Sequence, residues 1–136
     1  MDFNCIVVGG GVVGLAAAAH ISKSVENVAL FERNSTVGFE TSSRNSEVVH
    51  AGLYYARDSL KARLCVEGRR EIYRLSQEHG IPAKKCGKIV VATTPEETEQ
   101  LHKLLKKGRE NGVEGLRMLT GAQVMKREPH VSAIEG

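Results

Sequence analysis

The stretch Gly9-Gly10-Gly11-Val12-Val13-Gly14 decides the fold of this chain. An apolar run at residues 3–8 precedes it, and a run of small, helix-forming residues at 15–19 follows it. A second apolar run, residues 28–31, ends on Glu32. The order strand, glycine turn, helix, strand and acid is typical of a dinucleotide-binding βαβ unit.

Each glycine of this turn has its own predicted task. Gly9 allows the sharp turn out of the strand, Gly11 lets the backbone approach a pyrophosphate, and Gly14 lets the helix pack on the strands. The helix N-terminus offers free N–H groups to the phosphates. A carboxylate at Glu32 accepts hydrogen bonds from ribose hydroxyls and repels a 2′-phosphate, which favours FAD or NAD over NADP. The alternative is a glycine turn that only shortens a βα connection.

Composition excludes several classes of protein. The chain has 136 residues, of which 41% are hydrophobic, and a net charge of +3, so it can form a core and shows no nucleic-acid module. Its three cysteines have no zinc-ligand spacing, and we expect reduced thiols, no metal and a cytoplasmic location. No signal peptide precedes the first strand, and no apolar run is long enough to span a bilayer.

Residues 33–58 form a polar, irregular segment. Residues 43–49 are predicted to form one or two helical turns, with Ser42 or Ser43 as the N-cap. Hydroxyl and N–H groups at such a helix start suit a phosphate or a flavin edge, although a Ser/Thr-rich segment is often only a loop. His50 is either structural or functional, and two tyrosines that follow it favour a lined pocket.

The second half of the chain reads as helices with short strands. Asp58 or Ser59 is predicted to cap a helix that runs to about His79. Strands are predicted at 86–93 and 116–119, and Thr94 and Thr120 each begin a capping box at a helix start. The apolar positions predicted to form the core-facing stripe of the first of these helices are Leu60, Leu64, Gly68, Ile72 and Leu75.

The order of these segments resembles the D-amino-acid-oxidase-like flavoproteins, and in particular the L-2-hydroxyglutarate dehydrogenase/oxidase family. Besides the glycine motif, the resemblance rests on residues 44–55, 59–68, 86–92 and 128–129. It implies an α/β fold, with a partial Rossmann-like FAD-binding domain at residues 1–58 and the beginning of an α+β substrate domain at 59–136.

The resemblance also implies the cofactor and the residues of the site. It implies FAD, with the pyrophosphate at the glycines and the adenosine ribose at Glu32. His50 would lie near the flavin ring and take the substrate's hydroxyl proton, and Tyr54 and Tyr55 would lie toward the substrate. The full set of cofactor-binding residues predicted is Gly9, Gly11, Val13, Gly14, Glu32, Arg33, Thr41, Ser42, Asn45 and Ser46.

The resemblance covers only the N-terminal third of such enzymes. We therefore expect an N-terminal fragment of an FAD-dependent oxidoreductase that converts an L-2-hydroxy acid, L-2-hydroxyglutarate, to the 2-oxo acid, and that is inactive as the isolated chain. A separate chain is expected to supply the rest, and peripheral membrane association is the alternative to a purely cytoplasmic location. The alternative functions are oxidation of glycerol 3-phosphate or of an amino acid, or a non-catalytic nucleotide-binding or subunit module.

Overall fold

The chain forms two compact units, Met1–Val48 and Val49–Gly136. The structure is a computed structural model that describes residues 2–136. The boundary between the units lies earlier than the functional boundary expected between residues 58 and 59. Each unit is therefore described by itself.

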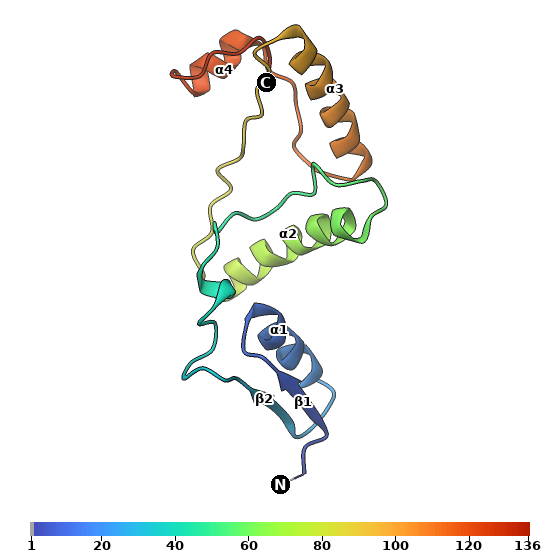
Figure 1. The fold of residues 1–136 in the computed structure, drawn as a ribbon, viewed down its shortest axis with the longest axis vertical. Coiled ribbons are helices and arrows are strands. Elements are labelled where there is room, and N and C mark those ends of the chain that lie inside the picture. The colour runs from blue at the N-terminus through green and yellow to red at the C-terminus, as the bar shows by residue number, and fades with distance from the viewer. Residues whose placement is uncertain (1) are drawn as a thin grey trace. The chain divides into compact units, whose positions relative to one another are not determined.

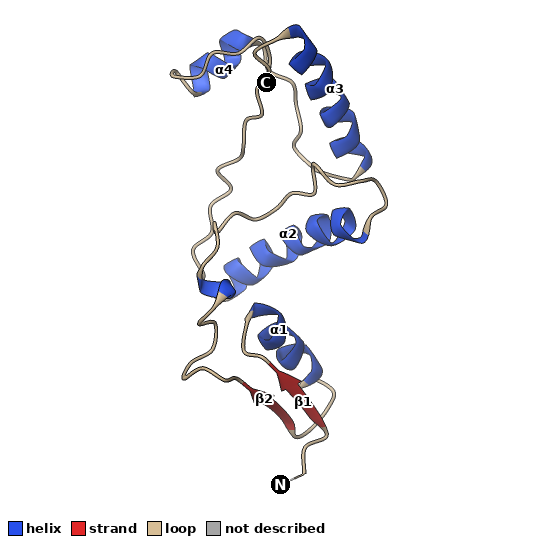
Figure 2. Cartoon of the chain, in the orientation of Figure 1, coloured by secondary structure: helices blue, strands red, loops and turns tan. Residues whose placement is uncertain are grey.

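The first unit contains the predicted βαβ arrangement, which confirms the α/β class. Strand β1 is Cys5–Val8, helix α1 is Val12–Ile21 and strand β2 is Val28–Phe31 (Figures 1 and 2). The two strands are parallel, and their register pairs Val8 with Phe31. Because the strands are parallel and end in register, the glycine turn after β1 and the acid after β2 meet at one edge of the sheet.

The two faces of this sheet differ in their covering. The β1 residue Val7 faces α1, because a Cβ placed on Gly14 would lie 3.6 Å from its Cγ1. Since side chains alternate along a strand, Ile6 and Val8 point to the opposite face, where their exposed fractions are 53% and 84%. Parallel sheets are ordinarily covered on both faces, so this outer face is an uncovered apolar surface.

The segment after β2 does not form the helix predicted at residues 43–49. A 3-10 helix covers Thr41–Ser43 instead. The side-chain oxygen of Asn45 accepts the N–H of Glu47 at 2.8 Å, and Glu47 adopts a left-handed backbone with φ of 55°. This local side-chain hydrogen bond competes with helix formation and ends the turn.

Three helices form the frame of the second unit: α2 at Leu60–Glu78, α3 at Pro95–Glu110 and α4 at Gly121–Arg127. Ser59 caps α2 by accepting the N–H of Ala62 at 3.1 Å, as predicted. The Thr120 capping box at α4 is also confirmed. At α3, Thr94 accepts the N–H of Glu97, but the Glu97 carboxylate accepts from Thr93 rather than from the cap residue, so that box is incomplete.

The predicted core stripe of α2 is wrong. Leu60, Leu64 and Ile72 have exposed fractions of 62%, 51% and 46%. The helix instead buries Ala62 and Val66, since a Cβ on Gly52 would lie 3.1 Å from atoms of both residues. The periodicity showed an apolar face, but packing against the loop at Gly52 uses a neighbouring face. Gly68, another member of the predicted stripe, makes no close contact either, because a Cβ there would meet no atom within 4 Å.

The strands predicted at 86–93 and 116–119 are wrong as well. Within residues 2–136, pairing in these regions is limited to isolated antiparallel bridges of Ala92 and Thr120 with Glu135. Gly87 takes a left-handed backbone with φ of 81°, which interrupts an extended run. The buried apolar side chains of this unit are Ala62, Val66, Ala92, Leu101, Val113 and Val124.

Candidate functional site

The glycine turn between β1 and α1 is tight and depends on missing side chains. Gly9 has a φ of 105°, and its N–H donates to the carbonyl of Phe31 at 2.8 Å, which ties the turn to β2. A Cβ on Gly14 would lie 1.9 Å from the carbonyl oxygen of Gly9, which no side chain tolerates. The predicted roles of Gly9 in turning and of Gly14 in close packing agree with this geometry.

The N-terminus of α1 presents hydrogen-bond donors to the cleft beside it. The N–H of Val12 donates to the hydroxyl of Ser42 at 2.8 Å, although the two residues are 30 positions apart. Within residues 2–136, the N–H groups of Gly11, Val13 and Gly14 have no hydrogen-bond partner. Unpaired donors at a helix N-terminus stabilise an anion, because the helix dipole adds partial positive charge there.

Glu32 is held in place by the turn itself. One carboxylate oxygen accepts the N–H of Gly10 at 2.6 Å, and the other accepts the backbone and side-chain N–H groups of Asn34, both at 2.9 Å. The hydrogen bonds from the backbone of Asn34 and then of Gly10 lower the pKa of Glu32 below its usual value. The carboxylate therefore stays ionised and keeps lone pairs available for further donors such as a diol.

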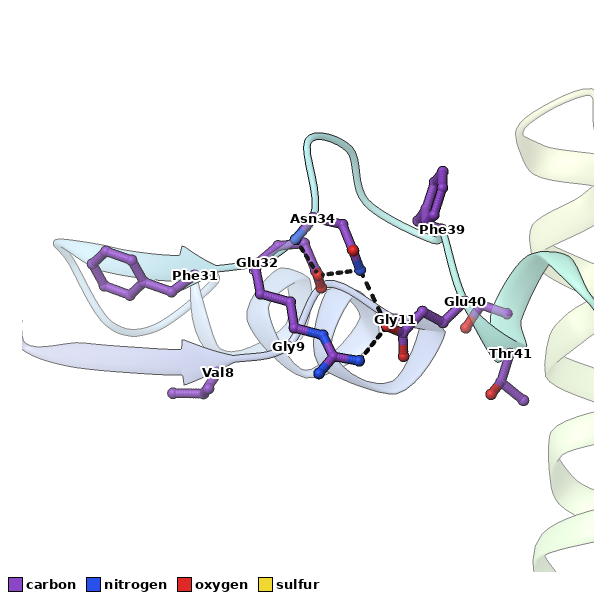
Figure 3. A pocket seen from close by; sticks show the side chains of 11 residues that line it. Val8, Gly9, Gly11, Phe31, Glu32, Asn34, Phe39, Glu40 and Thr41 are labelled. Atoms are coloured by element: carbon purple, nitrogen blue, oxygen red, sulfur yellow. Dashed lines mark hydrogen bonds and ion pairs between the residues drawn. The ribbon is translucent and has the colours of Figure 1, made fainter.

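These groups line one open cleft of about 320 Å³ in the first unit. Figure 3 shows Glu32 linked to Asn34, and Asn34 linked to Glu40, along its side. Arg33 forms an ion pair with Glu40, which lowers the pKa of that carboxyl. The lining residues are Val8, Gly9, Gly11, Phe31, Glu32, Arg33, Asn34, Phe39, Glu40, Thr41 and Ser42.

The structure gathers most, but not all, of the predicted cofactor residues at this cleft. Thr41 and Ser42 lie in its wall. Asn45 does not line it, and its amide donates instead to the carbonyl of Ser42 at 3.0 Å. Ser46, Val13 and Gly14 are also outside the lining, and Val13 is an exposed side chain in the first turn of α1.

The predicted catalytic and substrate residues lie in the second unit. The hydroxyl of Tyr55 is 3.1 Å from Nδ1 of His50, and their rings are stacked with an interplanar angle of 24°. Tyr54 has an exposed side chain with the ammonium group of Lys88 4.7 Å from its ring centroid. The structure therefore pairs His50 with Tyr55 and keeps Tyr54 apart from that pair.

Five residues that line the cleft were not predicted as site residues: Val8, Phe31, Asn34, Phe39 and Glu40. Asn34 and Glu40 complete the network around Glu32, and Phe39 supplies an apolar wall. A polar side chain two positions after the strand-ending acid is a usable signal for Asn34, because it returns to the carboxylate by a local turn. Glu40 and Phe39 carry no comparable signal, since only the path of the loop brings them back to the cleft.

The described residues hold no cluster of three or more His, Cys, Asp and Glu side chains suited to a metal ion. Nor does any helix among them combine the length and the apolar character that crossing a membrane requires.

Comparison with protein families gives a match along almost the whole chain. Residues 4–136 match the family described as DAO, FAD dependent oxidoreductase. The chain belongs to this family. The match agrees with the cleft's unpaired N–H groups and held carboxylate, and it confirms FAD as the family's cofactor.

Curated relatives point to one branch of the family. The chain is 47% identical over 132 residues to the mitochondrial L-2-hydroxyglutarate dehydrogenase of Arabidopsis thaliana, covering 97% of this chain and 27% of that protein. It is 41% identical to the L-2-hydroxyglutarate dehydrogenase of Indibacter alkaliphilus, covering 98% and 34%. The chain thus spans about a third or less of the relatives it matches.

A solved structure shows the same fold. The chain matches the dithionite-reduced L-alpha-glycerophosphate oxidase of Mycoplasma pneumoniae, which has FAD bound, with a TM-score of 0.85 and 30% identity. The match covers 99% of this chain and 37% of the oxidase. The chain therefore shares its fold with part of an FAD-bound oxidase.

Proposed function

We propose that this chain supplies the dinucleotide-binding portion of an FAD-dependent oxidoreductase that oxidises L-2-hydroxyglutarate to 2-oxoglutarate. The single observation that carries the cofactor is the juxtaposition in one cleft of Gly11, whose N–H at the start of α1 is unpaired within residues 2–136, with the ionised carboxylate of Glu32. A pyrophosphate requires the first and a ribose diol the second. The curated relatives support the substrate.

Each predicted residue has a proposed task toward FAD. Gly9, Gly11 and Gly14 admit the pyrophosphate, with Val13 contributing its N–H. Glu32 accepts hydrogen bonds from the ribose hydroxyls, and Arg33 lies close to the ribose. Residues 41–46 border the pyrophosphate and the flavin side, through Thr41, Ser42, Asn45 and Ser46.

The second set of residues acts on the substrate. FAD, when bound, supplies a two-electron acceptor for the hydride that leaves C2 of the hydroxy acid. His50 takes the proton of the substrate hydroxyl, a role that suits imidazole because it exchanges protons near neutral pH. Tyr54 and Tyr55 border the substrate. In functional terms, residues 1–58 serve the cofactor and residues 59–136 begin the substrate region.

The 136 residues are proposed to need a further polypeptide for turnover. The outer face of the β1–β2 sheet is apolar and uncovered, with Val8 84% and Phe31 52% exposed. The matched stretch makes up only 27% and 34% of two of the relatives, which are therefore about three to four times as long as this chain. A polypeptide that covers this face and completes the substrate site fits both observations. A cytoplasmic location, with peripheral membrane association as the alternative, is likewise a proposal.

The cofactor proposal is tested by titrating FAD into the purified chain and following flavin fluorescence. We expect saturable binding near one FAD per chain, and at least ~10-fold weaker binding for Glu32→Ala, which removes a charged hydrogen-bonding group. Glu26→Ala is the matched control, because Glu26 makes no hydrogen bond or ion pair within residues 2–136. Absence of saturable binding by a folded chain, or equal weakening by both variants, would overturn the proposal.

The substrate proposal is tested by complementation. The part of the Indibacter alkaliphilus relative that lies beyond its match to this chain is co-expressed with the 136 residues. We expect oxidation of L-2-hydroxyglutarate, but not of its D-isomer, only when both polypeptides are present. A preference for glycerol 3-phosphate would support the alternative function. Sequence identity favours hydroxyglutarate, because the two dehydrogenases are 47% and 41% identical to this chain and the glycerophosphate oxidase is 30% identical.

A further inference from the structure

The His50 side chain is paired through one ring nitrogen. Its Nδ1 lies 3.1 Å from the hydroxyl of Tyr55, and the two rings are stacked with centroids 6.5 Å apart. Within residues 2–136, Nε2 of His50 has no hydrogen-bond partner. The pairing therefore distinguishes the two nitrogens, and only Nε2 is available to a reacting group.

Tyr55 is itself held from two sides. The amide of Asn111 donates to its carbonyl oxygen at 3.0 Å, and to the carbonyl of Gly52 at the same distance. The ammonium group of Lys61, in the first turn of α2, lies 4.8 Å from the centroid of the Tyr55 ring. Backbone and ring are thus fixed by α3 and α2, while His50 is an exposed residue with no other side-chain partner among the described residues.

We propose that Tyr55 is a positioning residue for His50, which holds the imidazole by Nδ1 and directs Nε2 to the substrate. This inference rests on the proposed function, in which His50 accepts the proton of the substrate hydroxyl. It assigns Tyr55 a task different from direct substrate contact. It also makes Lys61 and Asn111 the residues that keep Tyr55 in place.

The proposal determines the tautomer of the neutral imidazole. A proton acceptor needs a lone pair, and with Nδ1 occupied that lone pair must be on Nε2. Nδ1 therefore carries the proton and donates to the Tyr55 oxygen, which accepts. When Nε2 takes the substrate's proton, the substrate oxygen keeps the electron pair of the broken O–H bond and the ring gains one positive charge.

Tyr55 keeps its role when the ring is charged. The Tyr55 oxygen continues to accept from Nδ1, so the hydrogen bond persists and becomes charge-assisted. The Lys61 ammonium lies at the face of the Tyr55 ring, 4.8 Å from its centroid, and favours the position of that ring.

The test is nitrogen NMR of the full 136-residue chain labelled with 15N-histidine, recorded in alkaline buffer where the ring shifts no longer change with pH. A protonated and an unprotonated ring nitrogen have well separated 15N shifts. His50 signals are assigned by their loss in His50→Gln. We expect the wild-type chain to have the Nδ1–H form as its major tautomer, and a wild-type chain with mainly Nε2–H would overturn the proposal without any variant.

The variants separate positioning from general structure. Tyr55→Phe is expected to shift the tautomer ratio about fivefold toward Nε2–H, the equivalent of one net hydrogen bond of ~1 kcal/mol. Tyr73→Phe is the matched control, because Tyr73 also has a lysine at its ring, with Lys85 Nζ 4.5 Å from the centroid, but no histidine partner. An unchanged ratio in Tyr55→Phe, or an equal shift in Tyr73→Phe, would overturn the inference.

FAD binding is measured on the same samples to separate the two proposals. Tyr55→Phe is expected to bind FAD as the wild type does. If the wild-type chain fails to bind FAD while its His50 is the Nδ1–H tautomer, the proposed function fails and the positioning role of Tyr55 survives. If FAD binds and the tautomer is Nε2–H, only the positioning role fails.

Discussion

The side-chain amide of Asn111 donates to the backbone carbonyl of Tyr55 at 3.0 Å, across 56 positions of sequence. The same nitrogen also donates to the carbonyl of Gly52. Lys107 donates to the carbonyl of Tyr54 at 2.9 Å. The C-terminal end of α3 therefore holds the loop that carries the predicted substrate residues.

Asn111→Ala is expected to loosen this loop. Two hydrogen bonds of about 1 kcal/mol net each are lost, so we expect the free energy of unfolding of the second unit to fall by about 1–3 kcal/mol. Asn111→Asp should destabilise at least as much, because a carboxylate then faces two carbonyl oxygens. Amide hydrogen exchange at residues 52–56 measures the effect.

The control for this prediction is Gln100→Ala, on the exposed surface of the same helix. Its side chain makes no hydrogen bond within residues 2–136, so exchange at the loop should stay at the wild-type rate. A wild-type rate of amide exchange at residues 52–56 in Asn111→Ala would contradict the proposed role of Asn111 in holding the loop. So would equal acceleration by the control.

Gly14→Ala is expected to disrupt the first unit and its FAD binding. The added Cβ would lie 1.9 Å from the Gly9 carbonyl oxygen, so either the turn or α1 must move. Gly68→Ala is the matched control, because this helical glycine has no atom within 4 Å of the added Cβ. Alanine there should stabilise α2 by about 0.5–1 kcal/mol, the usual gain over glycine in a helix.

Thermal unfolding and FAD titration of both variants measure this contrast. We expect a lower melting temperature and weaker FAD binding for Gly14→Ala only. If Gly14→Ala binds FAD with wild-type affinity, the turn tolerates a side chain at this position. The close approach of Gly14 to the Gly9 carbonyl would then not be needed for cofactor binding.

The first unit is expected to lose stability in acid through Glu32. Hydrogen bonds from Asn34 and Gly10 lower its pKa in the folded state, whereas the unfolded value lies near ~4.3. A lowered folded pKa contributes stability above the unfolded pKa, and this contribution is lost as the pH falls through the folded pKa. Glu32→Gln should therefore flatten the dependence of unfolding on pH below about 4.3.

Urea unfolding between about pH 3 and pH 6, across the range where carboxyl groups titrate, measures this dependence. Glu26→Gln serves as the control, since Glu26 makes no ion pair or hydrogen bond in the described chain. If the free energy of unfolding of Glu32→Gln changes with pH as steeply as that of the wild type, the hydrogen bonds at Glu32 do not contribute to stability in acid.

The uncovered sheet face is expected to cause self-association of the isolated chain. Val8 and Phe31 are paired in register and are 84% and 52% exposed. Val8→Thr combined with Phe31→Thr should reduce concentration-dependent association in sedimentation velocity, because threonine keeps β propensity and removes apolar area. The double variant should fold as the wild type does.

A pair of apolar residues in the second unit provides the comparison. Leu60→Thr combined with Leu64→Thr alters two exposed leucines of α2 and leaves the sheet face unchanged. If the Val8/Phe31 double variant still associates and the Leu60/Leu64 double variant does not, the surface that causes self-association lies on α2 and not on the sheet.

The cofactor half of the site was predictable because its geometry is local. Gly9, Gly11, Gly14 and Glu32 belong to one βαβ unit, and the two parallel strands necessarily end at one edge. Thr41 and Ser42 were predicted by resemblance, and the structure places both in the cleft. Glu40 and Phe39 were missed because their place depends on the path of a loop.

Long-range contacts decided which helix face is buried and which extended segments pair, and neither follows from periodicity or residue type. The apolar stripe through Leu60, Leu64 and Ile72 predicted the helix correctly but its buried face wrongly, because packing at Gly52 selects Ala62 and Val66. The run at 86–93 has strand-like composition, yet a strand requires a partner, and within residues 2–136 only Ala92 finds one.

The sequence by itself determined the βαβ unit and the starts of the long helices, because glycine turns, caps and strand-ending acids act over a few bonds. Only the tertiary structure decided that Ser42 accepts the N–H of Val12, that Asn34 and Gly10 hold Glu32, and that Asn111 holds the loop in which Tyr55 pairs with His50. Apart from the local contacts of Asn34 with Glu32 and of Tyr55 with His50, these hydrogen bonds join groups that are distant in sequence. Their geometry exists only once the chain has folded.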